Sequence, residues 1–160
     1  MCNGEIELFR IGDLFVGRRG KRLIKEDMIP GKTNYIGAIS SNNGVREHIR
    51  VEPEDIFPGN CITVNYNGSV GEAFYQDEPF WPSDDVNVLY ARNDWTLDRE
   101  TGLFVATLIK ANRFKFDYGR KWVLDKLLDT EIPLPSTGEG RPDWDFIRGF
   151  MKSLHWIEGL

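Results

Sequence analysis

An Asn-Gly pair between two runs of strand-forming residues is the strongest local constraint on how this chain of 160 residues folds. The pair is Asn67-Gly68, and it lies within residues 61–75, which read CITVNYNGSVGEAFY. Both central residues of a type I′ turn need positive φ angles, which Asn and Gly adopt more readily than other residues. The pattern therefore predicts a β-hairpin over residues 61–75, with its turn at the Asn-Gly pair.

The rest of the first half is also typical of β-structure, because Gly and Pro interrupt it often and the segments between them are short. Further strands are predicted at residues 6–11, 33–39, 45–51 and 85–90, with a short helical turn at residues 12–15. The turn signal Asn42-Asn43-Gly44 makes the second and third of these strands antiparallel neighbours.

After residue 95 the spacing of apolar residues becomes helical. Helices are predicted at residues 101–112 and 120–128, followed by an extended segment at 131–135, a loop at 136–141 and a last helix from 142 to about 154. We therefore expect one α+β domain with a β-rich first half, two helices in the second half and a C-terminal helix.

The last helix carries an apolar stripe that is a candidate interface with a partner or with a second copy of the chain. Its residues are Ile147, Phe150, Met151 and Leu154, with Trp156 after them. The alternative is that the stripe packs on its own domain. Residues 1–135 are then the body of the domain, and residues 136–160 are a loop and a helix that serve one of these two purposes.

Composition excludes several classes of protein. Hydrophobic residues at 41% and charged residues at 28% describe a globular chain rather than a disordered one. No apolar run approaches the ~18 residues of a membrane helix, and the first five residues lack a signal-peptide pattern. Cys2 and Cys61 form neither a disulfide framework nor a CxxC zinc motif. We expect a cytoplasmic protein without a membrane partner.

The net charge is −5, but two segments of the chain are strongly basic. Residues 17–25 (GRRGKRLIK) carry +5 and residues 110–121 (KANRFKFDYGRK) carry +4, which leaves −14 for the rest of the chain. Such a polarised domain has two candidate surfaces for contact with a polyanion on an otherwise acidic body. Two solvated basic loops that bind nothing are the alternative.

The common catalytic patterns are missing from the sequence. Neither GxGxxG nor GxxxxGK[ST] is present, and His48 and His155 have no metal-binding context. Asp84 and Asp85 with Glu72 could hold Mg²⁺ in a small nuclease, because carboxylates are preferred ligands of this ion. The same residues are also ordinary turn and strand-start residues, so we expect no enzyme, no metal and no cofactor.

A set of basic and amide side chains remains, and these residue types contact phosphates and base edges. The candidate DNA-contacting residues are Arg18, Arg19, Lys21 and Arg22 in an expected loop, Asn42 and Asn43 in a turn, and Lys110, Arg113, Lys115, Tyr118, Arg120 and Lys121 in the second basic segment. Asn residues at a turn also have a purely structural explanation. Phe114 and Phe116 are expected in the core rather than as platforms for stacked bases.

The order of the segments resembles a target recognition domain. These domains belong to the DNA specificity subunits of type I restriction–modification systems and to related fused restriction–methylation enzymes. The resemblance covers roughly residues 6–135, and residues 119–144 resemble the fused branch. It rests on the order of residues 11–15 (IGDLF), 20–23 (GKRL), 35–38 (YIGA), 43–44 (NG), 62–71 (ITVNYNGSVG), 84–86 (DDV), 126–127 (KL) and 132–135 (IPLP).

The resemblance implies an α/β domain with a curved, mostly antiparallel sheet that presents loops to the major groove. It implies that the chain reads one half of a bipartite sequence in double-stranded DNA and docks an adenine methyltransferase subunit, which a motor-nuclease subunit joins for cleavage. Such a domain is not itself catalytic. The expected DNA contacts are at residues 18–22, 42–43 and 110–121, while residues 67–71 and 132–135 maintain the fold.

A complete specificity subunit carries two recognition domains separated by long helices, whereas this chain has one. It is therefore a half-subunit that pairs with itself, a piece of a longer protein, or a domain whose partners supply the rest. A homodimer would read a palindromic site, because twofold symmetry is copied into the DNA. The alternative function is an interaction module that binds restriction–modification subunits without reading DNA.

Overall fold

The computed structural model describes residues 5–115 and 121–158 of the chain. Its helices and strands are, in order, β1 (Ile6–Arg10), α1 (Ile11–Leu14), β2 (Phe15–Arg19), β3 (Pro30–Ile36), β4 (Val45–Ile49), β5 (Cys61–Asn65), β6 (Ala73–Gln76), β7 (Phe80–Pro82), β8 (Val86–Ala91), α2 (Arg99–Ala111), α3 (Leu124–Asp129), β9 (Glu131–Pro135) and α4 (Trp144–Glu158). Short 3-10 turns lie at Lys25–Asp27, Asn42–Gly44, Pro53–Asp55 and Arg113–Lys115.

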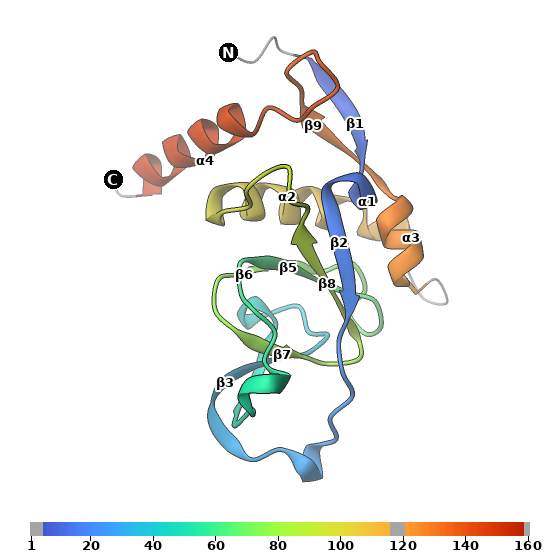
Figure 1. The fold of residues 1–160 in the computed structure, drawn as a ribbon, viewed down its shortest axis with the longest axis vertical. Coiled ribbons are helices and arrows are strands. Elements are labelled where there is room, and N and C mark those ends of the chain that lie inside the picture. Colours follow the sequence, from blue (N-terminus) through green and yellow to red (C-terminus); the bar gives the residue numbers. More distant parts are fainter. Residues whose placement is uncertain (1–4, 116–120, 159–160) are drawn as a thin grey trace.

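Within these residues the strands form three sheets, with the orders β1-β9, β2-β8-β5-β6 and β4-β3-β7. The pairings are antiparallel except for β3 with β7. Figure 1 shows α4 and the β1–β9 ribbon at one end, the three-stranded sheet at the other, and α2 with the four-stranded sheet between them. The predicted mixed α+β, mostly antiparallel fold is confirmed.

The predicted hairpin forms, but its turn was predicted wrongly. Strands β5 and β6 pair from Cys61↔Gln76 to Val64↔Ala73, so a longer loop over residues 66–72 replaces a two-residue turn. Only Gly68 and Gly71 have positive φ in this loop. The Asn67 side chain instead donates to Asp85 Oδ1 at 2.9 Å, which ties the loop to the turn before β8. A contact distant in sequence thus overrides the local turn preference.

The other Asn-rich turn forms as predicted. Asn42, Asn43 and Gly44 have φ angles of 51°, 53° and 81°, and β3 and β4 pair antiparallel on either side. Asn and Gly tolerate this left-handed region better than other residues, so the sequence fixes the turn locally.

The helices largely follow the predicted periodicity. Helix α2 begins at a capping box, in which the Asp98 side chain accepts the backbone N–H of Thr101 and the Thr101 hydroxyl accepts the backbone N–H of Asp98. Helix α3 begins at Leu124, four residues later than position 120, because Val123 is extended and the Trp122 carbonyl accepts the Asn87 side-chain amide at 3.1 Å. No helix in the described ranges is long and apolar enough to cross a membrane.

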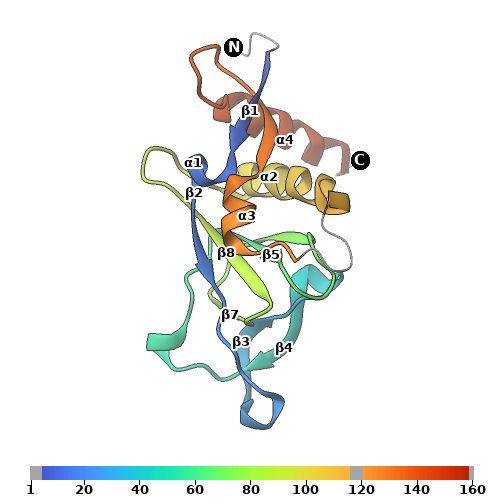
Figure 2. The same ribbon diagram turned by 90° about the vertical axis from the view of Figure 1, so that its right-hand side faces the viewer.

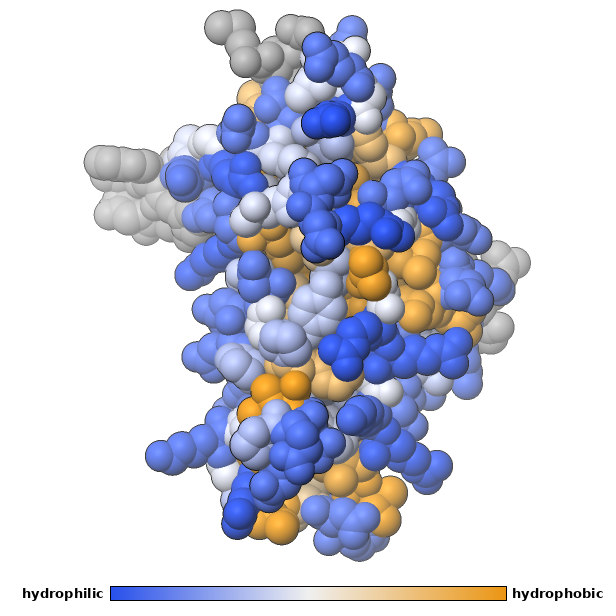
Figure 3. Space-filling view, in the orientation of Figure 1, coloured by the Kyte–Doolittle hydropathy of each residue, from blue (hydrophilic) through white to orange (hydrophobic). Residues whose placement is uncertain are grey.

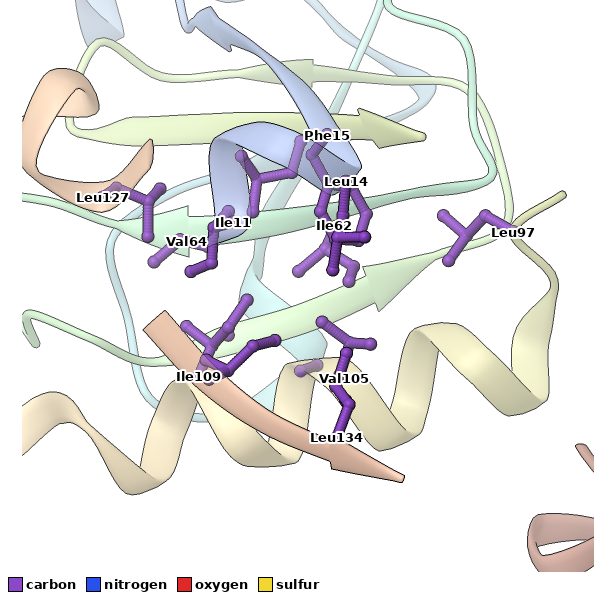
Figure 4. Packing of buried hydrophobic residues seen from close by; sticks show 14 of the residues in the cluster. Ile11, Leu14, Phe15, Ile62, Val64, Leu97, Val105, Ile109, Leu127 and Leu134 are labelled. Atoms are coloured by element: carbon purple, nitrogen blue, oxygen red, sulfur yellow. The ribbon is translucent and has the colours of Figure 1, made fainter. Parts of the chain in front are cut away.

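Both faces of the four-stranded sheet are covered, so β5 is buried along its whole length. Strand alternation sends Ile62, Val64 and Leu89 toward the helices, where they share a core with α1, α2, α3, β9 and α4. It sends Cys61, Val86 and Val88 into a second core against the three-stranded sheet. Figure 4 shows the first core, with Val105 and Ile109 of α2 facing Ile62 and Val64. Each fully buried side chain of this size contributes about 1.5–3 kcal/mol.

Candidate nucleic-acid interface

The first basic segment begins in a strand, which corrects the prediction that Arg18 and Arg19 lie in a loop. Strand β2 pairs with β8 in the register Arg18↔Val88 and Arg19↔Asn87. This ladder pairs residues that lie far apart in the sequence. The short run of basic residues has no alternation of apolar and polar side chains that would predict a strand.

Strand alternation places the two arginines on opposite faces of the sheet. The Arg18 guanidinium lies over the Phe57 ring, 4.1 Å from its centroid. Arg19 instead lines a hollow together with Leu124, on the face where Leu124 also packs against Gly17. Figures 1 and 2 both show α3 beside β2. Arg18 and Arg19 therefore lie on opposite faces of β2 and have different surroundings.

Lys21 follows in irregular backbone and is held by several contacts. Its Nζ lies 3.5 Å from Asp55 Oδ1 and its backbone N–H donates to the Pro82 carbonyl. Its own carbonyl accepts Trp81 Nε1 at 3.1 Å. Arg22 is exposed and makes no ion pair with another described residue. Of the predicted cluster, Arg19 and Arg22 are thus the two cations left available to a ligand.

Asn42 and Asn43 use their amide groups within the turn. Asn42 Nδ2 donates to the Val45 carbonyl at 3.0 Å, and Asn43 Nδ2 donates to the Tyr75 carbonyl at 3.0 Å. The Asn43 carbonyl in turn accepts Gln76 Nε2 at 2.9 Å. The Asn43 contacts fasten the turn to β6, and each of the two side-chain amides uses at least one N–H within the chain.

Glu72 holds two cations of the second basic segment. Its carboxylate lies 2.8 Å from Arg113 Nη1 and 3.8 Å from Lys110 Nζ, and its side chain is only 15% exposed. Lys110 Nζ also lies 4.4 Å from the centre of the Phe74 ring. Both cations are partly neutralised at the surface, so they contribute less to an anion site than the sequence suggested.

Phe114 was predicted in the core, and this was wrong, because its side chain is 73% exposed beside Lys110 and Arg113. Tyr118, Arg120 and Phe116 lie outside the described residues, as does the side chain of Lys115. Lys121 is described and exposed.

The first basic segment and the start of α3 meet at a hollow of about 250 Å³ that sequence reasoning did not anticipate. Its lining residues are Arg19, Gly20, Tyr66, Asp84, Asn87, Val123 and Leu124. Arg19 comes from the first segment, and Val123 and Leu124 lie two and three residues after the end of the second. Tyr66 and Asp84 lie in segments that carry the family resemblance, which was the available signal, but only the fold brings them together.

The carboxylates considered for a nuclease are not gathered into a metal site. Glu72 is engaged with Lys110 and Arg113, and Asp85 Oδ1 accepts the Asn67 side-chain amide. The described residues contain no group of three or more His, Cys, Asp or Glu side chains suited to hold a metal ion.

The stripe on α4 is divided between the core and the surface. Ile147 is fully buried in the main core, and Met151 packs against it. Phe150 and Leu154 are 44% and 38% exposed. Trp156 lies in the helix, and its side chain is outside the described part. In Figure 3 most of the visible surface is hydrophilic, with separate hydrophobic patches that include one over β1 and α3.

Arg148 fastens α4 to the start of α2. Its Nε donates to Asp98 Oδ2 at 2.6 Å and its Nη2 donates to the Thr96 carbonyl at 2.6 Å. Burial raises the pKa of Asp98, but the hydrogen bonds from Thr101 and Arg148 outweigh it and hold this pKa below its ordinary value.

Residues 3–159 match the family of type I restriction modification DNA specificity domains. The chain belongs to this family. The resemblance noted in the sequence is thereby confirmed.

The specificity domain has a similar relative in the specificity subunit S.BcgI of a type II restriction enzyme from Heyndrickxia coagulans. The two are 36% identical over 146 residues, which is 91% of this chain and 42% of the relative.

Two solved structures share the fold of the specificity domain. One is a type I restriction–modification S subunit from M. genitalium, with a TM-score of 0.66, 20% identity and coverage of 94% of this chain and 40% of that chain. The other belongs to a study of complex assembly and conformational transition of a type I system, with a TM-score of 0.68, 13% identity and coverage of 98% and 40%. The chain thus spans about two fifths of these relatives.

Proposed function

We propose that this specificity domain binds double-stranded DNA in the cytoplasm, reads one half of a bipartite target and docks an adenine methyltransferase subunit, which a motor-nuclease subunit joins. The family match over residues 3–159 carries the proposal. The domain supplies recognition, and the catalytic groups belong to its partners.

The arrangement of free positive charge supports contact with DNA. In the two basic segments, Arg19, Arg22, Lys25 and Lys121 are exposed and make neither an ion pair nor a cation–π contact with another described residue. Phosphates attract such side chains, and base edges are read between them.

The second half of the target needs a second reading domain, because the chain spans about two fifths of its relatives. We propose that α4, with its exposed Phe150 and Leu154 and with Trp156 later in the same helix, contacts either a second copy of the chain or a partner subunit. A twofold pair would read a palindromic site.

Selection from a library of random duplexes tests the proposal, with the full chain alone and with the methyltransferase of its system. We expect an enriched half-site sequence. If three of the four free cations contact phosphates and the fourth contacts a base, log affinity falls with log salt with a slope of roughly −3. Absence of any enriched sequence in both arrangements would refute DNA reading.

One observation favours the interaction module as a second candidate. Lys21, Lys110 and Arg113 are paired with Asp55 and Glu72, so part of the basic charge is already neutralised within the chain. Such a module would co-purify with the methyltransferase and leave its DNA footprint unchanged. A footprint that the domain extends or redirects would exclude this function.

A further inference from the structure

We propose that the hollow beside β2 reads one G·C base pair of the DNA target, with Arg19 on the guanine and Asp84 on the cytosine amino group. The inference rests on the proposed function and adds the identity of a base pair and of the residues that select it. Neither residue forms a side-chain ion pair within the described residues, although both line the same hollow.

Arg19 has the donor geometry that guanine requires. Its planar guanidinium presents two parallel N–H groups, which match the O6 and N7 acceptors on the major-groove edge of guanine. Its backbone is fixed in the β2–β8 ladder opposite Asn87. A rigid strand, rather than a free loop, therefore fixes the backbone position from which the Arg19 side chain extends.

The backbone after Arg19 lies directly against the turn that carries Asp84. A Cβ on Gly20 would lie 1.8 Å from the Ser83 carbonyl oxygen, so only glycine fits this close approach. The Gly20 N–H also donates to the Val86 carbonyl at 3.0 Å. These contacts fix the positions of Arg19 and Asp84 relative to each other.

Asp84 is the unusual member of the hollow, because a carboxylate on a DNA-facing surface repels phosphates. Its neighbour Asp85 accepts the Asn67 amide and has a structural role. Asp84 is exposed and makes no side-chain hydrogen bond with another described residue. The favourable DNA partner of a carboxylate is a base amino group, above all N4 of cytosine.

One G·C pair presents both partners side by side in the major groove. Guanine supplies two acceptors and cytosine supplies one donor on the same edge. An A·T pair has a single purine acceptor next to a donor, so the Arg19 fork could not bind it with both N–H groups. Tyr66, Val123 and Leu124 also line the hollow.

The test repeats the duplex selection with Arg19→Lys and Asp84→Ala in the full chain with its methyltransferase. Arg19→Lys keeps the charge and loses the planar fork. Arg99→Lys and Asp77→Ala make the same chemical changes at exposed positions that do not line the hollow. Melting temperatures are recorded for all variants, and Asp84→Ser replaces Asp84→Ala if that variant unfolds.

We expect the unaltered chain to select G·C at one position, and each hollow variant to reduce that preference roughly 5- to 150-fold at the same position. The control variants should keep it. The proposal is overturned if the preference survives both changes, if the variants affect different positions, or if the affected pair is A·T. Failure of the unaltered chain to select any duplex refutes the proposed function itself.

Discussion

The indole rings of Trp95 and Trp144 lie parallel, with centroids 3.9 Å apart and an interplanar angle of 7°. Trp95 belongs to the segment between β8 and α2, and its Nε1 donates to the Leu14 carbonyl at 2.8 Å. Trp144 is the first residue of α4. The stack therefore fixes the C-terminal helix to the body of the domain at the point where the helix begins.

Replacement of Trp144 by Ala should lower the free energy of unfolding by about 2–3 kcal/mol. The loss of the half-buried Trp144 ring leaves a cavity and removes the stacking partner of Trp95. Urea unfolding followed by circular dichroism measures the change. Phe146→Ala, two residues later on the exposed side of the helix, should cost clearly less. Equal losses in the two variants would contradict a specific role of the stack.

Asp98 should make stability depend on pH in the acid range. Its pKa is lower in the folded state than in the unfolded chain, so the folded state binds fewer protons. The stabilisation is complete above about pH 4 and is lost as the pH falls through the folded-state pKa.

Asp98→Asn keeps an oxygen that can cap α2 but removes the charge that attracts Arg148. The difference in unfolding free energy between the unaltered chain and this variant should shrink as the pH is lowered from 6 to about 2.5. When Arg148→Met has removed the guanidinium, Asp98→Asn should change the unfolding free energy by less than it does in the unaltered chain. A difference that grows toward low pH would show that the sign is wrong.

Arg18 and Arg19 should behave differently although they are adjacent. Arg18→Ala removes a cation from the Phe57 ring and should cost about 0.5–1 kcal/mol of stability, with little effect on DNA affinity. Arg19→Ala should preserve stability and weaken binding to the selected duplex by at least about fivefold. Thermal melts and fluorescence anisotropy measure the pair, and the reverse order of effects would contradict the placement of Arg19 on the DNA side.

Replacement of Glu72 by Gln should tighten DNA binding about two- to fivefold at low salt, because Lys110 and Arg113 lose the carboxylate that neutralises them. The slope of log affinity against log salt should become more negative by about one to two, because one or two further phosphate contacts form. Glu78→Gln changes the net charge equally at an exposed position in the β6–β7 turn. Equal gains in both variants would indicate net charge alone and exclude a local release of these cations.

Local chemistry in the sequence determined much of the fold. The left-handed Asn42-Asn43-Gly44 turn, the helix over 99–111 and the extended segment at 131–135 formed where predicted, because the preferences that produce them act within a few residues. The ordered segments also predicted the family correctly.

The tertiary structure alone decided which candidate side chains remain available to a ligand. Pairing with β8 turns the first basic segment into a strand and separates Arg18 from Arg19. Glu72 reaches Lys110 and Arg113, which lie about forty residues further along the chain, and occupies both. The hollow gathers Arg19, Tyr66 and Asp84 from three distant segments. The sequence determines local backbone preferences and total charge, whereas long-range strand pairing and packing determine which charges meet.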